Sequence, residues 1–392
     1  MSTFIQFDLV NSFVKEYYYL LWLCFAILTL LFGGYRWGRK IWHKLSAFWR
    51  TDVRELKRLN RELEQKLSRV RTAFDAGNHL WLRQPIVKPE RYDAKIQNSI
   101  PILLIANMKG GVGKTTLAAN LAAYFERRRN ERVLAIDIDY QGSLSSMLLP
   151  EPMNRQERTA QAVKVLIKGG PNANGDFTIA NSNPIRKSNR DSRVIDCDDP
   201  FEDFETQLLL EWLIGDINED IRYDLARVLH SNEIQDAFDR VIIDAPPRLT
   251  IGFVNALCAS THFVVPFVLD ILSAERIGKT LQRIKSMRGQ LFPHIELAAV
   301  VGTMKGDKTP TLRDAEKRAI EEAKRRVRRY WGPGDYVLDR YELLIPRKQP
   351  IADVAGLGIA YDNTEVQEIF DRLGHELANR APNTKQMPLA AE

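Results

Sequence analysis

The chain has 392 residues, of which 45% are apolar and 27% charged, so most of it is expected to fold around the core of one large or two ordinary domains. Its three cysteines lie far apart in the sequence, which excludes a disulfide framework and any cysteine pair with metal-ligand or redox spacing. The net charge of +6 is uneven: residues 36–95 carry 16 Lys and Arg against 7 Asp and Glu, whereas residues 96–392 have a net charge of −2. The basic excess therefore belongs to a short segment near the N-terminus.

The first predicted element is a transmembrane helix at about residues 17–35. These 19 residues carry no charge, and a helix of this length spans about 28 Å, close to the bilayer core of about 30 Å. Aromatic residues flank the run, and five basic residues follow it before the first acid, Asp52, so the positive-inside rule places the remainder in the cytoplasm. A signal peptide would carry its basic residues before the apolar run, and 19 uncharged residues are long for a buried core helix. We expect a single-pass protein of the bacterial inner membrane, with residues 1–35 as its N-terminal segment.

Residues 36–95 are predicted to form a basic juxtamembrane region, a stalk helix and a linker. Apolar residues recur at alternating spacings of three and four, which is typical of a heptad seam. The seam permits two interpretations: a parallel two-stranded coiled coil that pairs two chains, or a helix that packs on the domain by one stripe. Residues 77–95 contain glycine and prolines and are expected to be an irregular linker. The seam positions are Val53, Leu56, Asn60, Leu63, Leu67, Val70 and Phe74.

The large domain, residues 96–392, opens with a strand, a glycine-rich loop and a helix. The apolar run at 102–107 precedes the loop Met-Lys-Gly-Gly-Val-Gly-Lys-Thr-Thr, and residues 117–129 have helical periodicity. This order is the context in which a phosphate-binding loop is credible. Glycines let backbone N–H groups face an anion, and the helix N-terminus adds partial positive charge there. We expect Lys114 to reach the β- and γ-phosphates of ATP, and Thr115 to ligate Mg²⁺. The predicted nucleotide contacts of the loop are Lys109, Gly110, Gly111, Val112, Gly113, Lys114, Thr115 and Thr116.

The loop departs from the usual pattern because Met108 stands where the first glycine is expected, and a second lysine, Lys109, follows it. In this respect it resembles the deviant phosphate-binding loop of the ParA/MinD partition-type ATPases. The resemblance implies an α/β fold with a mostly parallel, doubly wound sheet. It also implies a homodimer that sandwiches two nucleotides, in which Lys109 contacts the phosphates bound by the other subunit.

Two apolar strands end in acids that extend the resemblance. The first closes on Asp137 and Asp139 and is similar to the family motif D-x-D-P-Q-G, with Tyr140 in place of proline. The second closes on Asp244 and resembles the motif D-x-P-P. The resemblance implies that Asp139 orients or activates the attacking water, that Asp137 lies near Mg²⁺, and that Asp244 holds Mg²⁺ through a water. Lys109, Lys114 and Asp139 are thus the predicted catalytic residues, and Thr115, Asp137 and Asp244 the predicted metal site.

Later segments complete the expected domain. Residues 261–270 and 295–307 are predicted to be strands, and residues 344–358 resemble a segment that flanks the adenine in relatives. The resemblance implies base contacts at Thr303, Met304 and Pro346. It covers about residues 100–375 and is weakest across 150–235, which includes a polar loop rich in glycine and asparagine.

One helix offers a candidate partner surface. Residues 313–329 carry eight basic and four acidic residues, so they could contact nucleic acid or form a solvated helix with internal ion pairs. The net charge of the large domain favours the second interpretation, and binding to nucleic acid is not favoured.

The sequence as a whole predicts a membrane-anchored, ATP-hydrolysing switch that engages an unidentified protein partner. One alternative is a membrane-associated bacterial tyrosine kinase, although only Tyr361 follows Tyr341 where such kinases carry a tyrosine cluster. The other is a nucleotide-sensing scaffold with little turnover, in a multi-component defence or transport system.

Overall fold

The computed structural model describes residues 20, 22–24, 26–27, 35–75, 77–150, 182–197, 200–306 and 311–383. It divides into two compact units, Met1–Ser68 and Arg69–Glu392. The predicted boundary at residue 95 therefore differs from the observed one, because residues 69–95 belong to the large unit.

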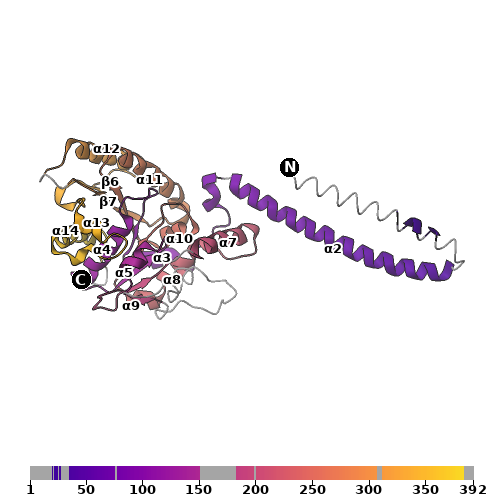
Figure 1. The fold of residues 1–392 in the computed structure, drawn as a ribbon. Coiled ribbons are helices and arrows are strands. Elements are labelled where there is room, and N and C mark those ends of the chain that lie inside the picture. Colours follow the sequence, from indigo (N-terminus) through magenta and orange to yellow (C-terminus); the bar gives the residue numbers. More distant parts are fainter. Residues whose placement is uncertain are drawn as a thin grey trace. The chain divides into compact units, whose positions relative to one another are not determined.

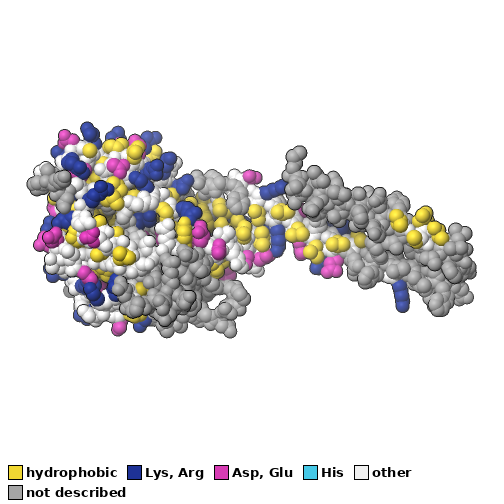
Figure 2. Space-filling model, viewed as in Figure 1, with side chains coloured by type: hydrophobic (Ala, Val, Ile, Leu, Met, Phe, Trp, Pro, Cys, Tyr) yellow, Lys and Arg dark blue, Asp and Glu magenta, His cyan; other side chains and the backbone are white. Residues whose placement is uncertain are grey.

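The helix α2 (Tyr35–Asp75) contains every predicted heptad position. Leu56, Leu63 and Leu67 are more than half exposed, and Figure 2 shows apolar side chains on the surface of the described part of this helix. Val70, in contrast, packs against the core of the large unit. Of the seam positions, Val70 thus packs within the large unit, whereas Leu56, Leu63 and Leu67 are exposed in the part of α2 that the structure describes.

The predicted transmembrane helix at residues 17–35 falls largely outside the described residues. Within the part of the chain that the structure describes, no helix combines the length and the apolar character needed to cross a membrane.

The described part of the large unit is built on an eight-stranded sheet, in the order β3-β4-β2-β5-β1-β6-β7-β8. Its pairs are parallel except for β3 with β4. The central strands are continuous apolar runs because both faces of the sheet are covered. This confirms the expected mostly parallel α/β sheet. The strands are β1 (Ile102–Ile105), β2 (Val133–Asp137), β3 (Asn183–Pro184), β4 (Arg193–Ile195), β5 (Arg240–Asp244), β6 (His262–Val268), β7 (Glu296–Thr303) and β8 (Val337–Leu338).

Helices lie on both faces of this sheet (Figure 1). Alternate residues of each strand enter different cores: Leu103 and Ile105 pack with α4 and α14, whereas Ile102 and Leu104 pack with α10 and α11. The α-helices are α3 (Tyr92–Gln97), α4 (Lys114–Arg127), α5 (Ser143–Leu148), α7 (Pro200–Ile214), α8 (Asp224–Leu229), α9 (Asn232–Ala237), α10 (Ile251–Ala259), α11 (Ile271–Leu291), α12 (Asp314–Tyr330), α13 (Gln349–Asp353) and α14 (Thr364–Arg380). The 3₁₀ helices are η1 (Gly77–Leu82), η3 (Ile221–Tyr223), η4 (Tyr341–Leu343) and η5 (Ala360–Asp362).

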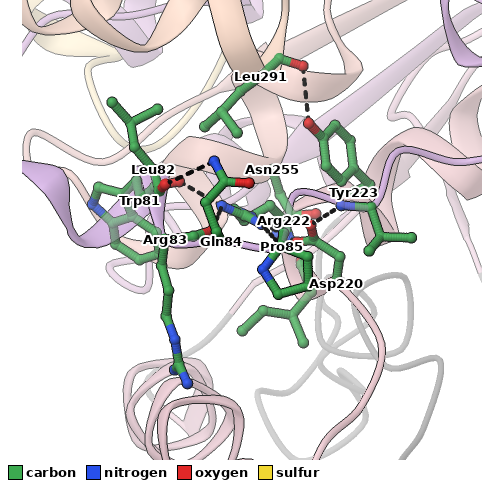
Figure 3. A network of polar contacts seen from close by, with 12 residues as sticks. Trp81, Leu82, Arg83, Gln84, Pro85, Asp220, Arg222, Tyr223, Asn255 and Leu291 are labelled. Carbon is green, nitrogen blue, oxygen red and sulfur yellow. Dashed lines mark hydrogen bonds and ion pairs between the residues drawn. The ribbon is translucent and has the colours of Figure 1, made fainter. Parts of the chain in front are cut away.

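A buried arginine fixes the predicted linker to the large unit (Figure 3). Arg222 is fully buried and forms two hydrogen bonds of 2.6 Å with the Asp220 carboxylate. Its guanidinium also donates to the carbonyl oxygens of Trp81, Arg83 and Pro85 at 2.7–3.0 Å. Irregular backbone needs partners for its carbonyl groups, and here one side chain supplies three of them. The linker is therefore an ordered part of the large unit, which explains why this unit begins at Arg69 and not after residue 95.

Candidate functional site

The glycine-rich loop connects the carboxyl end of β1 to the start of α4. Gly111 and Gly113 have φ angles of 69° and 83°, a left-handed conformation that favours glycine. Gly113 is also the N-cap of α4. A Cβ atom added at Gly110 or Gly111 would meet no atom within 4 Å, so the outer side of the loop is open. An open glycine loop at the N-terminus of α4 is suited to receive an anion, and the contact of its residues with nucleotide stays a prediction.

Two polar side chains hold the loop from the sheet. Asn107 donates to the carbonyl oxygen of Pro266 on β6 at 2.7 Å and accepts from the backbone N–H of Lys109 at 3.0 Å. The Thr303 hydroxyl lies 3.0 Å from the carbonyl oxygen of Val112 and 3.1 Å from that of Phe267. The ends of β6 and β7 thereby fix the shape of the loop. Asn107 was missed by the sequence reasoning, although its place between an apolar strand and the loop is a usable signal.

Lys114 is buried beneath the loop. Its ammonium group donates to the carbonyl oxygen of Lys109 at 3.4 Å. Burial lowers the pKa of Lys114, and the nearby carboxylates of Asp244 and Asp139 act in the opposite direction. A cation held among acids beneath an anion-binding loop is suited to contact phosphate oxygens.

The two strand-end acids lie side by side, because Asp137 on β2 and Asp244 on β5 are register partners. Asp244 is fully buried, and neither of its carboxylate oxygens has a hydrogen-bond partner of good geometry. Burial raises the pKa of Asp244 to about 7, while the Thr115 hydroxyl and the Lys114 ammonium oppose this rise. A buried carboxylate whose oxygens lack well-formed hydrogen bonds, beside a threonine hydroxyl, fits a Mg²⁺ ion that keeps several waters.

Asp137 differs from Asp244 because its oxygens are already engaged. They accept from the backbone N–H and hydroxyl of Ser145 at 2.8 and 2.7 Å, and from the backbone N–H of Asp139 at 3.1 Å. Burial, followed by the charge of Asp244, raises the pKa of Asp137 well above its usual value, and the bonds from Ser145 oppose this. Asp137 would therefore influence a metal ion indirectly, through Ser145 and the backbone of Asp139. Ser145 was also missed from the sequence.

No group of three or more His, Cys, Asp or Glu that could hold a metal ion by itself occurs among the described residues. The fit to Mg²⁺ therefore depends on Thr115 and Asp244, with phosphate and water oxygens as the other ligands.

Asp139 and Lys109 complete the predicted catalytic set. The Asp139 carboxylate is nearly buried and accepts from the backbone N–H of Gln141 at 3.2 Å. Lys109 is half-buried, and its ammonium makes no hydrogen bond or ion pair with any residue that the structure describes. The structure thus brings the loop and all three acids to one edge of the sheet, with one lysine buried and the other free.

The predicted base contacts lie beside the loop. The backbone N–H of Ile345 donates to the carbonyl oxygen of Gly302 at 3.0 Å, and Lys305 forms a parallel bridge with Pro346. This pairing places Pro346 next to Thr303 and Met304 at the end of β7. The Thr303 hydroxyl is engaged with the loop, and the contact of these three residues with a base stays a prediction.

The candidate partner surface at residues 313–329 forms α12. Four of its seven basic residues, Lys317, Lys324, Arg325 and Arg326, form ion pairs within the helix or with neighbours, as in Arg326–Glu322 at 2.5 Å and Lys324–Asp339 at 2.9 Å. Figure 2 shows basic and acidic side chains mixed over this part of the molecule.

Comparisons with known proteins agree with this geometry. A family model described as an AAA domain matches residues 100–297. The chromosome partitioning protein ParA of Caulobacter vibrioides is 30% identical over 289 residues, which cover 72% of this chain and 96% of the relative. The chromosome-partitioning ATPase Soj of Treponema pallidum is 25% identical over 284 residues, covering 71% and 97%.

Solved structures show the same fold. Cobyrinic acid a,c-diamide synthase from Mycobacterium smegmatis, bound to an ATP analogue and magnesium, superposes with a TM-score of 0.56 at 22% identity and covers 75% of this chain and 100% of that one. The ATP complex of a McdA variant from Cyanothece gives a TM-score of 0.55 at 18% identity and covers 75% and 99%.

Proposed function

The chain belongs to the ParA/MinD family of P-loop ATPases, and from this premise we propose that it is a membrane-anchored switch driven by ATP. The chain is an ATPase that uses ATP and Mg²⁺. In the proposed cycle, ATP brings two copies together as a nucleotide-sandwich dimer, the dimer engages a protein partner, and hydrolysis releases it.

Each polar group at the sheet edge has a proposed role in hydrolysis. Lys114 stabilises negative charge on the β- and γ-phosphate oxygens. Thr115 and, through a water, Asp244 would hold Mg²⁺, which would supply positive charge to offset the charge that develops on the phosphates. Asp139 orients the attacking water and accepts its proton. Asp137 stiffens this arrangement through Ser145 and the backbone of Asp139.

One observation carries the assignment of the site. Both carboxylate oxygens of Asp244 are buried and lack well-formed hydrogen bonds, and they lie beside the open loop and Lys114. A buried carboxylate whose oxygens lack good hydrogen bonds is costly to a fold, and a cation that binds with the nucleotide would offset this cost together with Lys114 and Thr115. The test is to titrate the full chain and its Asp244→Asn variant with MgATP and with ATP plus EDTA. The wild type should need Mg²⁺ for tight binding, and the variant should lose that dependence. Equal dependence in both proteins would contradict the role of Asp244.

The free ammonium of Lys109 supports the sandwich dimer. An unpaired lysine at the mouth of an anion-binding loop is available to the phosphates held by a second copy, which is the role that the family resemblance implies. The dimer makes the unit of hydrolysis a pair of chains with two nucleotides.

The membrane anchor is proposed from the sequence of residues 17–35 and the basic residues after them. The exposed leucines of α2 support pairing of two stalks. Two tethered copies have a raised effective concentration, so ATP would change the geometry of a pair that is already close. Deletion of residues 1–50 should release the protein from bacterial inner membranes, and continued pelleting with membranes would refute the anchor.

A protein is favoured over DNA as the partner, although two relatives are named for chromosome partitioning. Residues 96–392 have a net charge of −2, and four of the seven basic residues of α12 are engaged in ion pairs. Both features weaken attraction to a phosphate backbone.

A further inference from the structure

An arginine links the two loops that carry the acids of the site. Tyr140 directly follows Asp139, and Arg248 lies shortly after Asp244. The Arg248 guanidinium lies 5.1 Å from the centroid of the Tyr140 ring and donates to the Tyr140 hydroxyl. The same nitrogen donates to the Glu202 carboxylate on α7 at 3.1 Å. Three segments that are distant in sequence therefore meet at one guanidinium.

The loop after Asp244 is anchored to α7 a second time. The Glu205 carboxylate, one turn beyond Glu202, accepts from the backbone N–H of Gly252 at 2.6 Å, at the start of α10. A Cβ atom added at Gly252 would lie only 2.5 Å from the side chain of Ile138, which immediately precedes Asp139. The loop after β5 and the loop after β2 therefore touch through packing as well as through Arg248.

Stability of the fold does not explain the three-residue cluster. The side chains of Arg248 and Glu202 are 55% and 52% exposed, and ion pairs this exposed contribute little to stability. The cluster also borders a cavity of about 430 Å³ between α7, η1 and the loop after β5. Space on that side lets the cluster form or release without a change in the core.

We propose that Arg248 is a positioning residue for ATP hydrolysis. It connects the Asp139 loop to the Asp244 loop through its contacts with Tyr140, and its bond to Glu202 attaches both loops to α7. The water-orienting acid and the metal-holding acid would then keep one relative position. The inference rests on the proposed role of Asp139. Tyr140, which replaces the proline of the family motif, gains a function here because it supplies the ring and the hydroxyl that Arg248 contacts.

The test compares steady-state ATPase kinetics of the full chain with those of Arg248→Ala, Tyr140→Phe and the double variant. Misplacement of a catalytic group by about 1 Å can lower a rate by about a hundredfold. We expect Arg248→Ala to lower kcat by roughly tenfold or more, with KM for ATP within about twofold of the wild type, because binding by the loop is intact. Tyr140→Phe keeps the ring but loses the hydroxyl, so its kcat should lie between those of the wild type and Arg248→Ala.

The double variant separates positioning from two unrelated defects. If Arg248 acts through Tyr140, the double variant should be within about twofold of Arg248→Ala, since residues in one network are not additive. Arg248→Lys keeps the charge and should recover part of kcat. Arg372→Ala is the matched control, because Arg372 is 50% exposed and pairs with Glu368 at 2.7 Å on α14; its kcat should equal that of the wild type.

Two outcomes would overturn the proposal, and a third would overturn its premise. A kcat of Arg248→Ala within twofold of the wild type, measured beside an inactive Asp139→Ala variant, contradicts positioning by Arg248. Losses that multiply in the double variant contradict its action through Tyr140. An Asp139→Ala variant with full activity would instead refute the role of Asp139. Equal thermal midpoints of the variants confirm that the comparison concerns folded protein.

Discussion

Removal of the acid beneath the linker should destabilise the large unit strongly. In Asp220→Ala, the fully buried Arg222 loses both of its 2.6 Å bonds to a carboxylate. The Asp220 carboxylate also accepts from the backbone N–H of Val87 at 2.9 Å, and that bond is lost as well. An uncompensated buried charge left by such a truncation costs about 3–5 kcal/mol. We therefore expect the free energy of unfolding to fall by about 3–5 kcal/mol, a large share of a typical total.

The loss should be largest in the linker, which distinguishes this reasoning from general destabilisation. Urea unfolding gives the total effect, and hydrogen exchange of residues 77–90 gives the local one. Linker amides should exchange faster in Asp220→Ala, while amides of the central strands β1 and β5 follow the global change. Glu368→Ala is the control, because its ion pair with Arg372 is exposed and should contribute less than about 1 kcal/mol. A loss below about 1 kcal/mol in Asp220→Ala, or unchanged linker exchange, would refute the reasoning.

Three further predictions concern the site and its surroundings. Lys114→Ala should abolish ATP binding in a fluorescent-nucleotide titration, because the loop loses the one cation that it buries, and unchanged affinity would contradict the site. In a fragment that begins at Arg69 and so lacks most of the stalk helix α2, Lys109→Ala should bind ATP as the unsubstituted fragment does but lose the rise of specific activity with protein concentration, and a retained rise would argue against action across the dimer. Burial raises the pKa of Glu205 to about 7, so the folded chain holds a proton there that the unfolded chain releases near pH 4.5. The contribution of Glu205 to the free energy of unfolding should therefore fall by about 3 kcal/mol as the pH rises from about 4.5 to about 7. Glu205→Gln should remove that part of the pH dependence of urea unfolding, and an identical pH profile would show that Glu205 is not the group responsible.

The sequence predicted the loop, Asp137, Asp139 and Asp244 as one site because the acids end apolar strands and, with the loop, resemble the motifs of one family. A run such as residues 240–244 is apolar up to its final acid, which is a local signal that needs no knowledge of distant partners. The order of strand, loop and helix around Lys114 is equally local. These features can therefore be predicted without the fold.

The linker could not be predicted in the same way. Residues 83–90 have no periodic pattern, and their order depends on Arg222, which lies about 140 residues later. The roles of Thr303 and Ser145 likewise depend on contacts between distant segments. Sequence patterns indicate which face of a helix or strand is buried. The roles of Arg222, Thr303 and Ser145 depend instead on which other segment of the chain packs against each of them.

In the proposed cycle, ATP makes two large units associate. This association is tested most directly by sedimentation velocity of a fragment that begins at Arg69, where the compact unit begins, with the Asp139→Ala substitution to prevent hydrolysis. The account predicts a dimer with MgATP and a monomer with MgADP, and loss of the ATP-dependent dimer when Lys109→Ala is added. A fragment that binds MgATP to saturation and remains a monomer would contradict the account.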